Sequence, residues 1–441
     1  MGIPPYPSKT EALADFYEPL SEEMLKRAGL KSYYVPGHSV GNTIFYHEDE
    51  NIMLAGDMVS NSEDMLLPPA YRYTLNMEEA IDSAKILDVL KPEYISTGHG
   101  KVPFMKYKEG IKSIGLLEVE AKFDKAMPTG VAVSKSGRIF INYPKWGDDV
   151  TSSVVEILND NTEVPYPNKS MNFYDPNRPQ STWLSVQAMY IDYRDYLWIL
   201  DTGAPFFNSP NNKAAKLVLI DINKDIILKT YQFSEDVLLT TTYLNDVRFD
   251  WNRGEEGIAY ITDSSVNGPG AIIILDLASG EARRVLDGTL STSVDEDILP
   301  KVEGVPLQNV DKNGEVSKFH VAVDGIELSP DRKILYFCSL VGRFLFSIET
   351  NLLFSNFTDE ELESKVKKVV EKGSSDGLIM ASDGTLYAGD YENNSIISIS
   401  ASGEVTTILQ NDLILWPDSM SIGNDGYLYI TVNQVHRQAG D

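Results

Sequence analysis

One pattern of polar and apolar positions recurs along most of the chain. A polar pair is followed by a short apolar run, a polar turn and a second apolar run; the clearest copy is DGLIMASDGTLYAGD at residues 376–390. Two β-type runs joined by a turn predict a pair of antiparallel strands. Further copies open at Thr129, Gln187, Asn245, Asp324 and Asp418. Such repetition predicts one supersecondary unit that is used many times.

The spacing of the copies suits the blades of a β-propeller. A four-stranded blade takes about 40–50 residues, and every spacing accommodates one blade with loop insertions. The longest spacing contains a polar, acidic insertion at residues 291–318, and the next contains a capping box at Thr358 and Glu361, which predicts a surface helix ended by Gly373. The alternative all-β folds, a β-sandwich or a β-barrel, do not require six copies of one unit. We therefore predict a mainly β fold with a six-bladed β-propeller.

Residues 1–112 show a different, α/β alternation. Helices are predicted at residues 21–28 and 76–90, and strands at KSYYV, NTIFYH, NIMLAGD and PEYIS. We therefore expect two domains, covering residues 1–112 and 113–441. Polar residues follow three of the predicted strands, as His38 in PGHSVGN, Asp57 in LAGD and His99 in STGHG. Two histidines and an aspartate on loops suit a zinc site, although each alone is more often a surface residue.

These motifs resemble the C-terminal half of a metallo-β-lactamase-fold hydrolase, in which P-G-H-[ST]-x-G, G-D and G-H-G segments each supply a metal ligand. The resemblance implies metal-ligand roles for His38, Asp57 and His99. The H-x-H-x-D-H motif of that family is missing, since residues 1–37 contain no histidine. We therefore expect zinc not to be fully coordinated and a zinc hydrolase to be inactive in this chain. The half-domain would leave an apolar face for a partner or self-association to cover.

The region from about residue 118 to 441 resembles the Yellow/major royal jelly protein family. The resemblance rests on segments such as MPTGVAVSKSGRIFINYPKW, GPGAIIILDLASGEARRV and WPDSMSIGNDGYLYITVNQVHR. It implies a six-bladed propeller that binds small molecules, amines or lipids among them, at one axial mouth. The family pattern continues beyond this chain's last residues. We therefore expect an incomplete last blade that borrows residues 116–123 as an outer strand, and a truncated or fused reading frame stays open.

The polar residues that open the repeats would gather around one axis. We expect a ligand site formed by Thr129, Gln187, Asn245, Asp246, Asp324, Asp376 and Asp418. Carboxylates crowded on an axis repel one another unless a proton or a cation relieves them, so Asp324 and Asp376 could hold Ca²⁺ or another divalent metal, or a cationic ligand. The alternative is that these residues only cap turns. Trp146, Trp198, Tyr391 and Trp416 could wall an apolar pocket, or serve as core.

A second resemblance, to gluconolactonase-type propellers, provides an alternative function. That family holds a divalent metal with a Glu, an Asn and an Asp on the inner strands. Asp376 matches its Asp, whereas Asp324 stands where its Asn would be and Thr129 where its Glu would be. The leading hypothesis is therefore small-molecule binding at the axial mouth, with no catalytic residue assigned. The alternative is a metal-dependent lactone hydrolase.

Composition limits the partners and the compartment. The chain of 441 residues has 38 Lys and Arg against 65 Asp and Glu, a net charge of −27. Such a surface repels phosphate, so we expect neither nucleic acid nor membrane as a partner. Cys338 is the single cysteine, which excludes an intrachain disulfide. No signal peptide is visible, so we expect a cytoplasmic protein as the sequence stands, although relatives are commonly secreted.

Overall fold

The computed structural model describes residues 21–62, 65–67, 75–97, 105–106, 117–310 and 314–437. The chain divides into two compact units, Met1–Glu118 and Val119–Asp441, and each is described by itself. None of the helices in the described ranges is both long enough and apolar enough to cross a bilayer.

The first unit is built on a five-stranded sheet in the order β1-β2-β3-β6-β7. Its strands are β1 (Leu30–Tyr34), β2 (Thr43–His47), β3 (Ile52–Gly56), β6 (Tyr94–Thr97) and β7 (Met105–Lys106), and β3 and β6 run parallel. A small hairpin pairs β4 (Ser60–Ser62) with β5 (Met65–Leu67). The helix predicted at residues 76–90 is two helices, α2 (Met77–Ala84) and α3 (Ile86–Leu90), while α1 covers Glu22–Arg27. Alternate strand residues such as Ile44, Met53 and Ile95 are fully buried and form the core of this unit.

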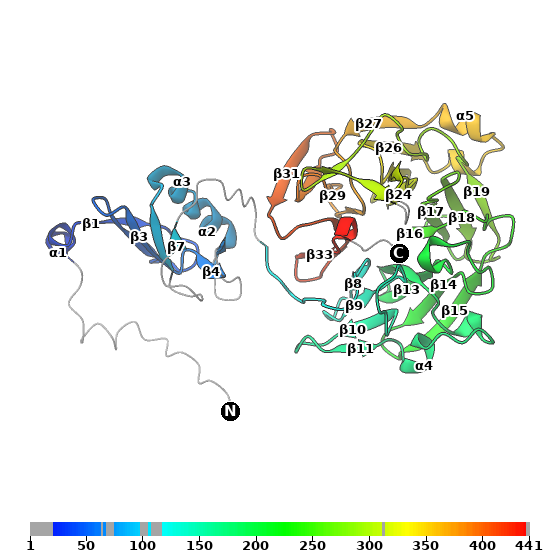
Figure 1. Ribbon diagram of the computed structural model, residues 1–441, viewed down its shortest axis with the longest axis horizontal. Coiled ribbons are helices and arrows are strands. Elements are labelled where there is room, and N and C mark those ends of the chain that lie inside the picture. Colours follow the sequence, from blue (N-terminus) through cyan, green and yellow to red (C-terminus); the bar gives the residue numbers. More distant parts are fainter. Residues whose placement is uncertain are drawn as a thin grey trace. The chain divides into compact units, whose positions relative to one another are not determined.

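The second unit is a six-bladed β-propeller whose sheets follow one another around a ring (Figure 1). Five blades have four strands, and the last has two among the described residues. The blades are β8 (Val131–Val133), β9 (Ile139–Asn142), β10 (Val154–Ile157), β11 (Glu163–Pro165); β12 (Val186–Ile191), β13 (Tyr196–Asp201), β14 (Lys216–Asp221), β15 (Ile226–Gln232); β16 (Leu244–Asp250), β17 (Ile258–Asp263), β18 (Ala271–Asp276), β19 (Ala282–Val285); β24 (Val323–Leu328), β25 (Ile334–Ser339), β26 (Phe344–Glu349), β27 (Lys367–Glu371); β28 (Leu378–Met380), β29 (Leu386–Asp390), β30 (Ser395–Ile399), β31 (Val405–Gln410); and β32 (Pro417–Ile422), β33 (Leu428–Val432).

The first strand of each blade lies innermost, and these inner strands surround the axis. β8 packs beside β12, and the contacts continue through β16, β24, β28 and β32 back to β8. The ring is closed by hydrogen bonds between the last and first blades, since Thr431 Oγ1 donates to Thr129 O and Val133 N donates to Ser421 Oγ at 3.1 Å. The repeated sequence pattern therefore produces one closed ring.

Glycine allows the inner strands to approach one another closely. A methyl group added at Gly325 would collide with the carbonyl oxygen of Asp376, and one at Gly377 with the carbonyl oxygen of Asp418. Gly377 N also donates a 3.0 Å hydrogen bond to Asp418 O. The Asp-Gly pairs that open two repeats are thus required by packing, because only glycine fits where two backbones meet.

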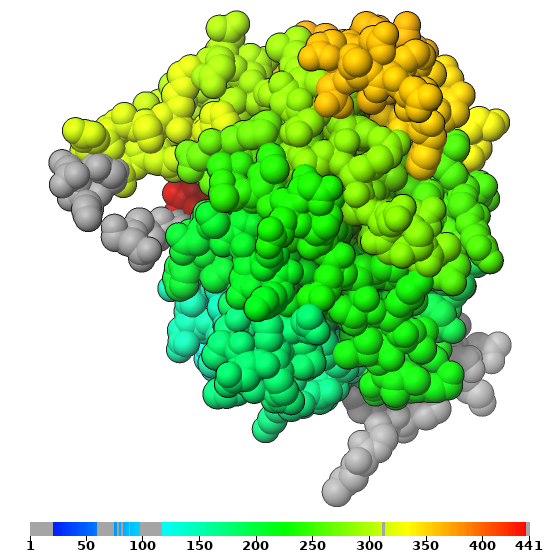
Figure 2. Space-filling view, turned by 90° about the vertical axis from the view of Figure 1, so that its right-hand side faces the viewer, coloured from blue at the N-terminus to red at the C-terminus, as the bar shows by residue number. Residues whose placement is uncertain are grey.

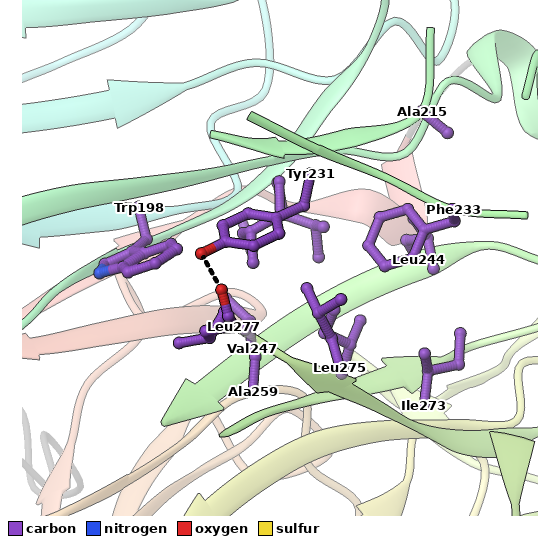
Figure 3. Packing of buried hydrophobic residues seen from close by; sticks show 14 of the residues in the cluster. Trp198, Ala215, Tyr231, Phe233, Leu244, Val247, Ala259, Ile273, Leu275 and Leu277 are labelled. Atoms are coloured by element: carbon purple, nitrogen blue, oxygen red, sulfur yellow. Dashed lines mark hydrogen bonds between the residues drawn. The ribbon is translucent and has the colours of Figure 1, made fainter. Parts of the chain in front are cut away.

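Apolar side chains fill the space between neighbouring blades (Figure 3). Between the second and third blades, Trp198 packs at 4.4 Å from the ring of Phe249, and Tyr231 Oη donates a 2.9 Å hydrogen bond to Leu277 O. Trp198, which sequence reasoning had also offered as a pocket wall, therefore belongs to this core. Figure 2 shows the outer side of the ring, with α5 (Asp359–Glu363) in orange at the top.

Two sequence predictions in the propeller are wrong. The helix expected from Thr358 to Gly373 ends at Glu363, although its capping box is confirmed, and residues 367–371 form β27 because the edge of β26 needs a pairing partner. Residues 117–123, expected to complete the last blade, form no strand. Instead, Ala121 and Phe123 pack against an apolar cluster that includes Tyr143 and Tyr429.

Short strands and helices lie in the loops. The insertion predicted at residues 291–318 contains two hairpins, of β20 (Lys301–Val302) with β21 (Val305–Pro306), and of β22 (Gln308–Val310) with β23 (Val316–Lys318). In the first blade, α4 (Lys169–Asn172) begins at Asn168, whose side chain accepts from Met171 N. These additions explain the unequal spacing of the repeats.

Candidate functional site

Five of the seven residues predicted at the axis line one cavity. Gln187, Asn245, Asp324, Asp376 and Asp418 come from five different blades and surround a space of about 40 Å³, hereafter the first axial cavity. Aromatic rings form much of the rest of its wall, namely Trp146, Phe207, Tyr243, Phe319 and Trp416. The first axial cavity thus combines three carboxylates with an aromatic lining.

β-Bulges place these polar residues at the beginning of the inner strands. The pairing register shifts between Val186 and Ala188 in β12 and between Leu244 and Val247 in β16. Corresponding shifts occur at the start of β24 and of β32. A bulge leaves a residue outside the ladder and redirects its side chain, so the residue at each shift can point along the axis.

Each of the three aspartates accepts a hydrogen bond from a neutral donor. Asn245 Nδ2 donates to Asp324 Oδ2 at 2.5 Å, and Trp416 Nε1 donates to Asp376 Oδ2 at 2.8 Å. Asn433 Nδ2 donates to Asp418 Oδ2. Within the described part of the chain, these three carboxylates form no ion pair with Lys, Arg or His, whose ion pairs lie elsewhere in the fold.

Burial raises the pKa of all three aspartates. It raises the pKa values of Asp324 and Asp418 well above the usual 3.8, and the charge of Asp376 raises both further. Burial also raises the pKa of Asp376 to about 6, although hydrogen bonds from Trp416 and Asp324 lower it. Buried carboxyl groups that line one cavity cannot easily all ionise together, which favours the protonated forms of Asp324 and Asp418.

The other two predicted axis residues lie elsewhere. Thr129 is fully buried between blades, where its hydroxyl donates to Gln187 O at 2.8 Å and accepts from Asn142 Nδ2 at 2.7 Å. Asp246 lines a larger cavity at the opposite end of the inner strands. Thr129, Asp324 and Asp376, which stand at the three metal-ligand positions of gluconolactonases although only Asp376 matches in residue type, therefore do not line a single cavity.

The aromatic wall is held by its own contacts. Trp146 Nε1 donates to Tyr243 Oη at 2.6 Å, and Tyr243 Oη donates to Gln187 Oε1 at 2.8 Å. Phe207 stacks on Trp146, with 5.3 Å between ring centroids. Sequence reasoning named Trp146 and Trp416 but missed Phe207, Tyr243 and Phe319. Tyr243 and Phe319 lie just before inner strands, outside the repeated pattern, and Phe207 ends a short 3-10 helix (Pro205–Phe207) that no motif marks.

Among the residues that the structure describes, no three His, Cys, Asp or Glu side chains are placed to share a metal. The aspartates of the first axial cavity already accept hydrogen bonds from Asn245, Trp416 and Asn433, so the donor set does not fit Ca²⁺ in this arrangement.

Two of the three predicted zinc ligands lie together in the first unit. His38 follows β1 and Asp57 follows β3, and Nε2 of His38 is 3.6 Å from Oδ2 of Asp57. Asp57 is 38% exposed and His38 is 16% exposed. His99 lies outside the described residues. The described pair alone supplies fewer ligands than a zinc site uses.

Comparison with known proteins gives a match for each unit. Residues 184–441 match the model of the family described as "Major royal jelly protein", and residues 2–99 match that of the metallo-beta-lactamase superfamily. A protein of Bacillus subtilis (strain 168) described as "Probable metallo-hydrolase" is 38% identical over 104 residues. That match covers 23% of this chain and 47% of the relative, so the chain spans about half of the relative's length.

Solved propellers resemble the second unit at low identity. Virginiamycin B lyase from Staphylococcus aureus is 15% identical with a TM-score of 0.41, covering 72% of this chain and 95% of the lyase. A gluconolactonase from Xanthomonas campestris is 12% identical with a TM-score of 0.44, covering 71% of this chain and 85% of that enzyme. The family match covers more than half of the chain, and we conclude that the chain belongs to the major royal jelly protein family.

Proposed function

We propose that the propeller binds a small primary amine, as its ammonium ion, in the first axial cavity. The observation that carries this proposal is the set of three buried aspartates, Asp324, Asp376 and Asp418, which have only neutral hydrogen-bond donors. Burying a carboxylate without a cationic partner is costly, and a ligand cation would remove that cost. The aromatic rings around the cavity would add cation–π attraction.

The size of the cavity limits the ligand. About 40 Å³ holds a few water molecules, and hence an ammonium group with a short chain. Without ligand, burial and the charge of Asp376 raise the pKa of Asp324 well above the usual 3.8 and so favour a proton on Asp324. An ammonium ion bound between them would replace this proton, so binding would release a proton to solvent.

Calorimetric titration of the full chain tests this proposal. A series of primary amines from methylamine to 2-phenylethylamine is compared with the matched alcohols, in buffers that differ in ionisation enthalpy so that proton release is measured. We expect heat with amines only and loss of binding in Asp376→Asn. Asp383→Asn is the matched control, because Asp383 lies in an exposed turn of the same blade and bonds Thr385 N. Absence of binding by every amine would refute the proposal.

The same titration tests the metal-dependent alternative. Binding of Ca²⁺ instead of amines, together with aldonolactone hydrolysis that is lost in Asp376→Ala, would favour the lactonase. That outcome would require the three aspartates to rearrange, because a divalent metal needs several oxygen ligands at about 2.3–2.6 Å.

For the first unit, we infer a partial zinc site at His38 and Asp57 without hydrolase activity. The two side chains approach within 3.6 Å, which is close enough to share an ion with further ligands. Metal analysis of the full chain purified with added zinc is the test. Stoichiometric zinc that is lost in His38→Ala, with hydrolysis of an ester or lactam substrate, would overturn the inference of inactivity.

A further inference from the structure

A second, larger cavity lies at the opposite end of the inner strands. It has a volume of about 500 Å³, hereafter the second axial cavity. Individual inner strands contribute to both cavities: β12 contributes Gln187 to the first and Met189 to the second, and β16 contributes Asn245 to the first and Arg248 to the second. The two cavities are therefore separate sites at the two ends of one ring of strands.

The buried charges of the second axial cavity are already paired. Arg248 donates to Asp246 Oδ1 at 2.7 Å, to Glu327 Oε2 at 2.9 Å and to Leu378 O at 2.6 Å. Asp192 is held by Arg194 at 2.6 Å. These charged groups are paired with one another within the protein and hold the cavity wall in place.

Two hydrogen-bond donors that line the second axial cavity are not paired with another group of the protein that the structure describes. Neither the guanidinium of Arg332 nor the hydroxyl of Tyr190 has a hydrogen bond or ion pair with any residue that the structure describes, and both line the cavity. Both groups line this one cavity, so one ligand there can meet both of them. Lys135 Nζ, also in the lining, donates only to Tyr193 O at 2.8 Å. The cavity therefore contains hydrogen-bond donors for which the described residues supply no acceptor.

The rest of the lining mixes polar and apolar groups, and its apolar part is adaptable. Met189, Met380 and Met420 contribute thioether side chains, and Ile191, Leu328 and Ile379 contribute branched ones. Methionine fits ligands of varied shape because its side chain is unbranched and polarisable. A volume of about 500 Å³ is typical of sites for small organic molecules, which combine an apolar lining with a few polar groups.

We propose that the second axial cavity binds a small organic acid, with its carboxylate held by Arg332 and Tyr190 and its apolar body against Met189, Met380 and Met420. Arginine matches a carboxylate with two parallel hydrogen bonds, and the phenol supplies a third. This site is independent of the amine site, so either can fail without the other.

The test titrates the full chain with three probes of one shape, 3-phenylpropanoate, 3-phenylpropan-1-ol and 3-phenylpropylamine, and with inorganic phosphate. We expect 3-phenylpropanoate to bind about tenfold or more tightly than the alcohol, because a charged hydrogen bond is lost in the alcohol. Equal affinity for the alcohol, binding of phosphate alone with equal affinity, or no binding of the acid would each overturn the proposal.

Substitutions locate the site. Arg332→Gln should weaken 3-phenylpropanoate binding about tenfold or more, and Arg332→Lys should keep part of the affinity. Lys333→Gln is the matched control, since it removes the same charge from the neighbouring position, where the side chain is 79% exposed and pairs with Asp331. An unchanged melting temperature of Arg332→Gln would show that it is folded. Wild-type affinity in this variant would refute the assignment.

Discussion

Trp416 Nε1 donates a 2.8 Å hydrogen bond to Oδ2 of Asp376, which joins the last two blades at the axis. The indole is held in place by Tyr391, whose ring stacks on it at 4.3 Å with an angle of 5° between the planes. An indole N–H can orient a carboxylate but cannot neutralise its charge. Burial therefore still raises the pKa of Asp376 to about 6.

Amine affinity should accordingly fall as the pH is lowered from 8 to 5. An alkylammonium ion stays protonated throughout this range, whereas Asp376 loses its charge as the pH falls through about 6. Because binding also displaces the proton of Asp324, the apparent affinity should fall by up to about tenfold per pH unit from pH 8 downward, and more steeply below about 6, where Asp376 also takes up a proton. Titration calorimetry at several pH values measures this dependence. Affinity that does not change between pH 8 and pH 5 would contradict the role given to Asp376.

Asp324→Asn should stabilise the protein at pH 8. The pKa of Asp324 is raised above its unfolded value, so the folded state binds more protons and loses stability as the pH rises above 3.8. An amide cannot ionise and can still accept the hydrogen bond from Asn245 Nδ2. We expect the free energy of unfolding at pH 8 to rise by about 1–3 kcal/mol, with the gain shrinking toward pH 5.

Urea unfolding at both pH values measures this gain, and Asp331→Asn is the control. Ser329 and Lys333 lower the pKa of Asp331 to about 2, so its carboxylate favours the folded state at neutral pH. The control variant should therefore show no gain at pH 8. A loss of stability in Asp324→Asn at pH 8 would show that its charge is satisfied by a cation in the folded protein.

The repeats predicted the ring but not which end of it each polar residue faces. Asp324, Asp376 and Asp418 share the first axial cavity, as the pattern of strand starts indicated. Asn245 and Asp246 are neighbours in sequence, yet they line opposite cavities. The register shift between Leu244 and Val247 separates them, and the sequence carries no signal for the position of that bulge.

The aromatic lining of the first axial cavity could not be predicted from the sequence for a related reason. Phe207 ends a short 3-10 helix (Pro205–Phe207) in the connection after β13, and Phe319 lies after the hairpins of the insertion before β24. Loop conformation depends on tertiary contacts, such as the stacking of Phe207 on Trp146, and is not encoded by a local period. By contrast, the four strands of the first blade could be predicted because each is a β-type run bounded by turn residues.

Gly377→Ala should destabilise the propeller although it adds only one methyl group. The added Cβ would collide with the carbonyl oxygen of Asp418 in the neighbouring inner strand, and a backbone atom cannot rotate away. We expect a loss of about 1–3 kcal/mol in the free energy of unfolding. Gly41→Ala is the control, because no atom lies within 4 Å of its added methyl. Equal stability of the two variants in urea unfolding would contradict the close approach of the strands.

Arg248→Met should be the most destabilising of these changes. The Arg248 side chain is 6% exposed and pairs with Asp246 and Glu327, so its removal leaves two buried carboxylates without a cation. We expect a loss of about 3–5 kcal/mol by urea unfolding, against less than about 1 kcal/mol for Arg178→Met, whose pair with Asp175 is at the surface. The triple variant Arg248→Met, Asp246→Asn, Glu327→Gln should recover much of the loss, because it removes the unpaired charges as well. If the triple variant were as unstable as Arg248→Met, packing of the arginine side chain, and not charge pairing, would hold this end of the propeller together.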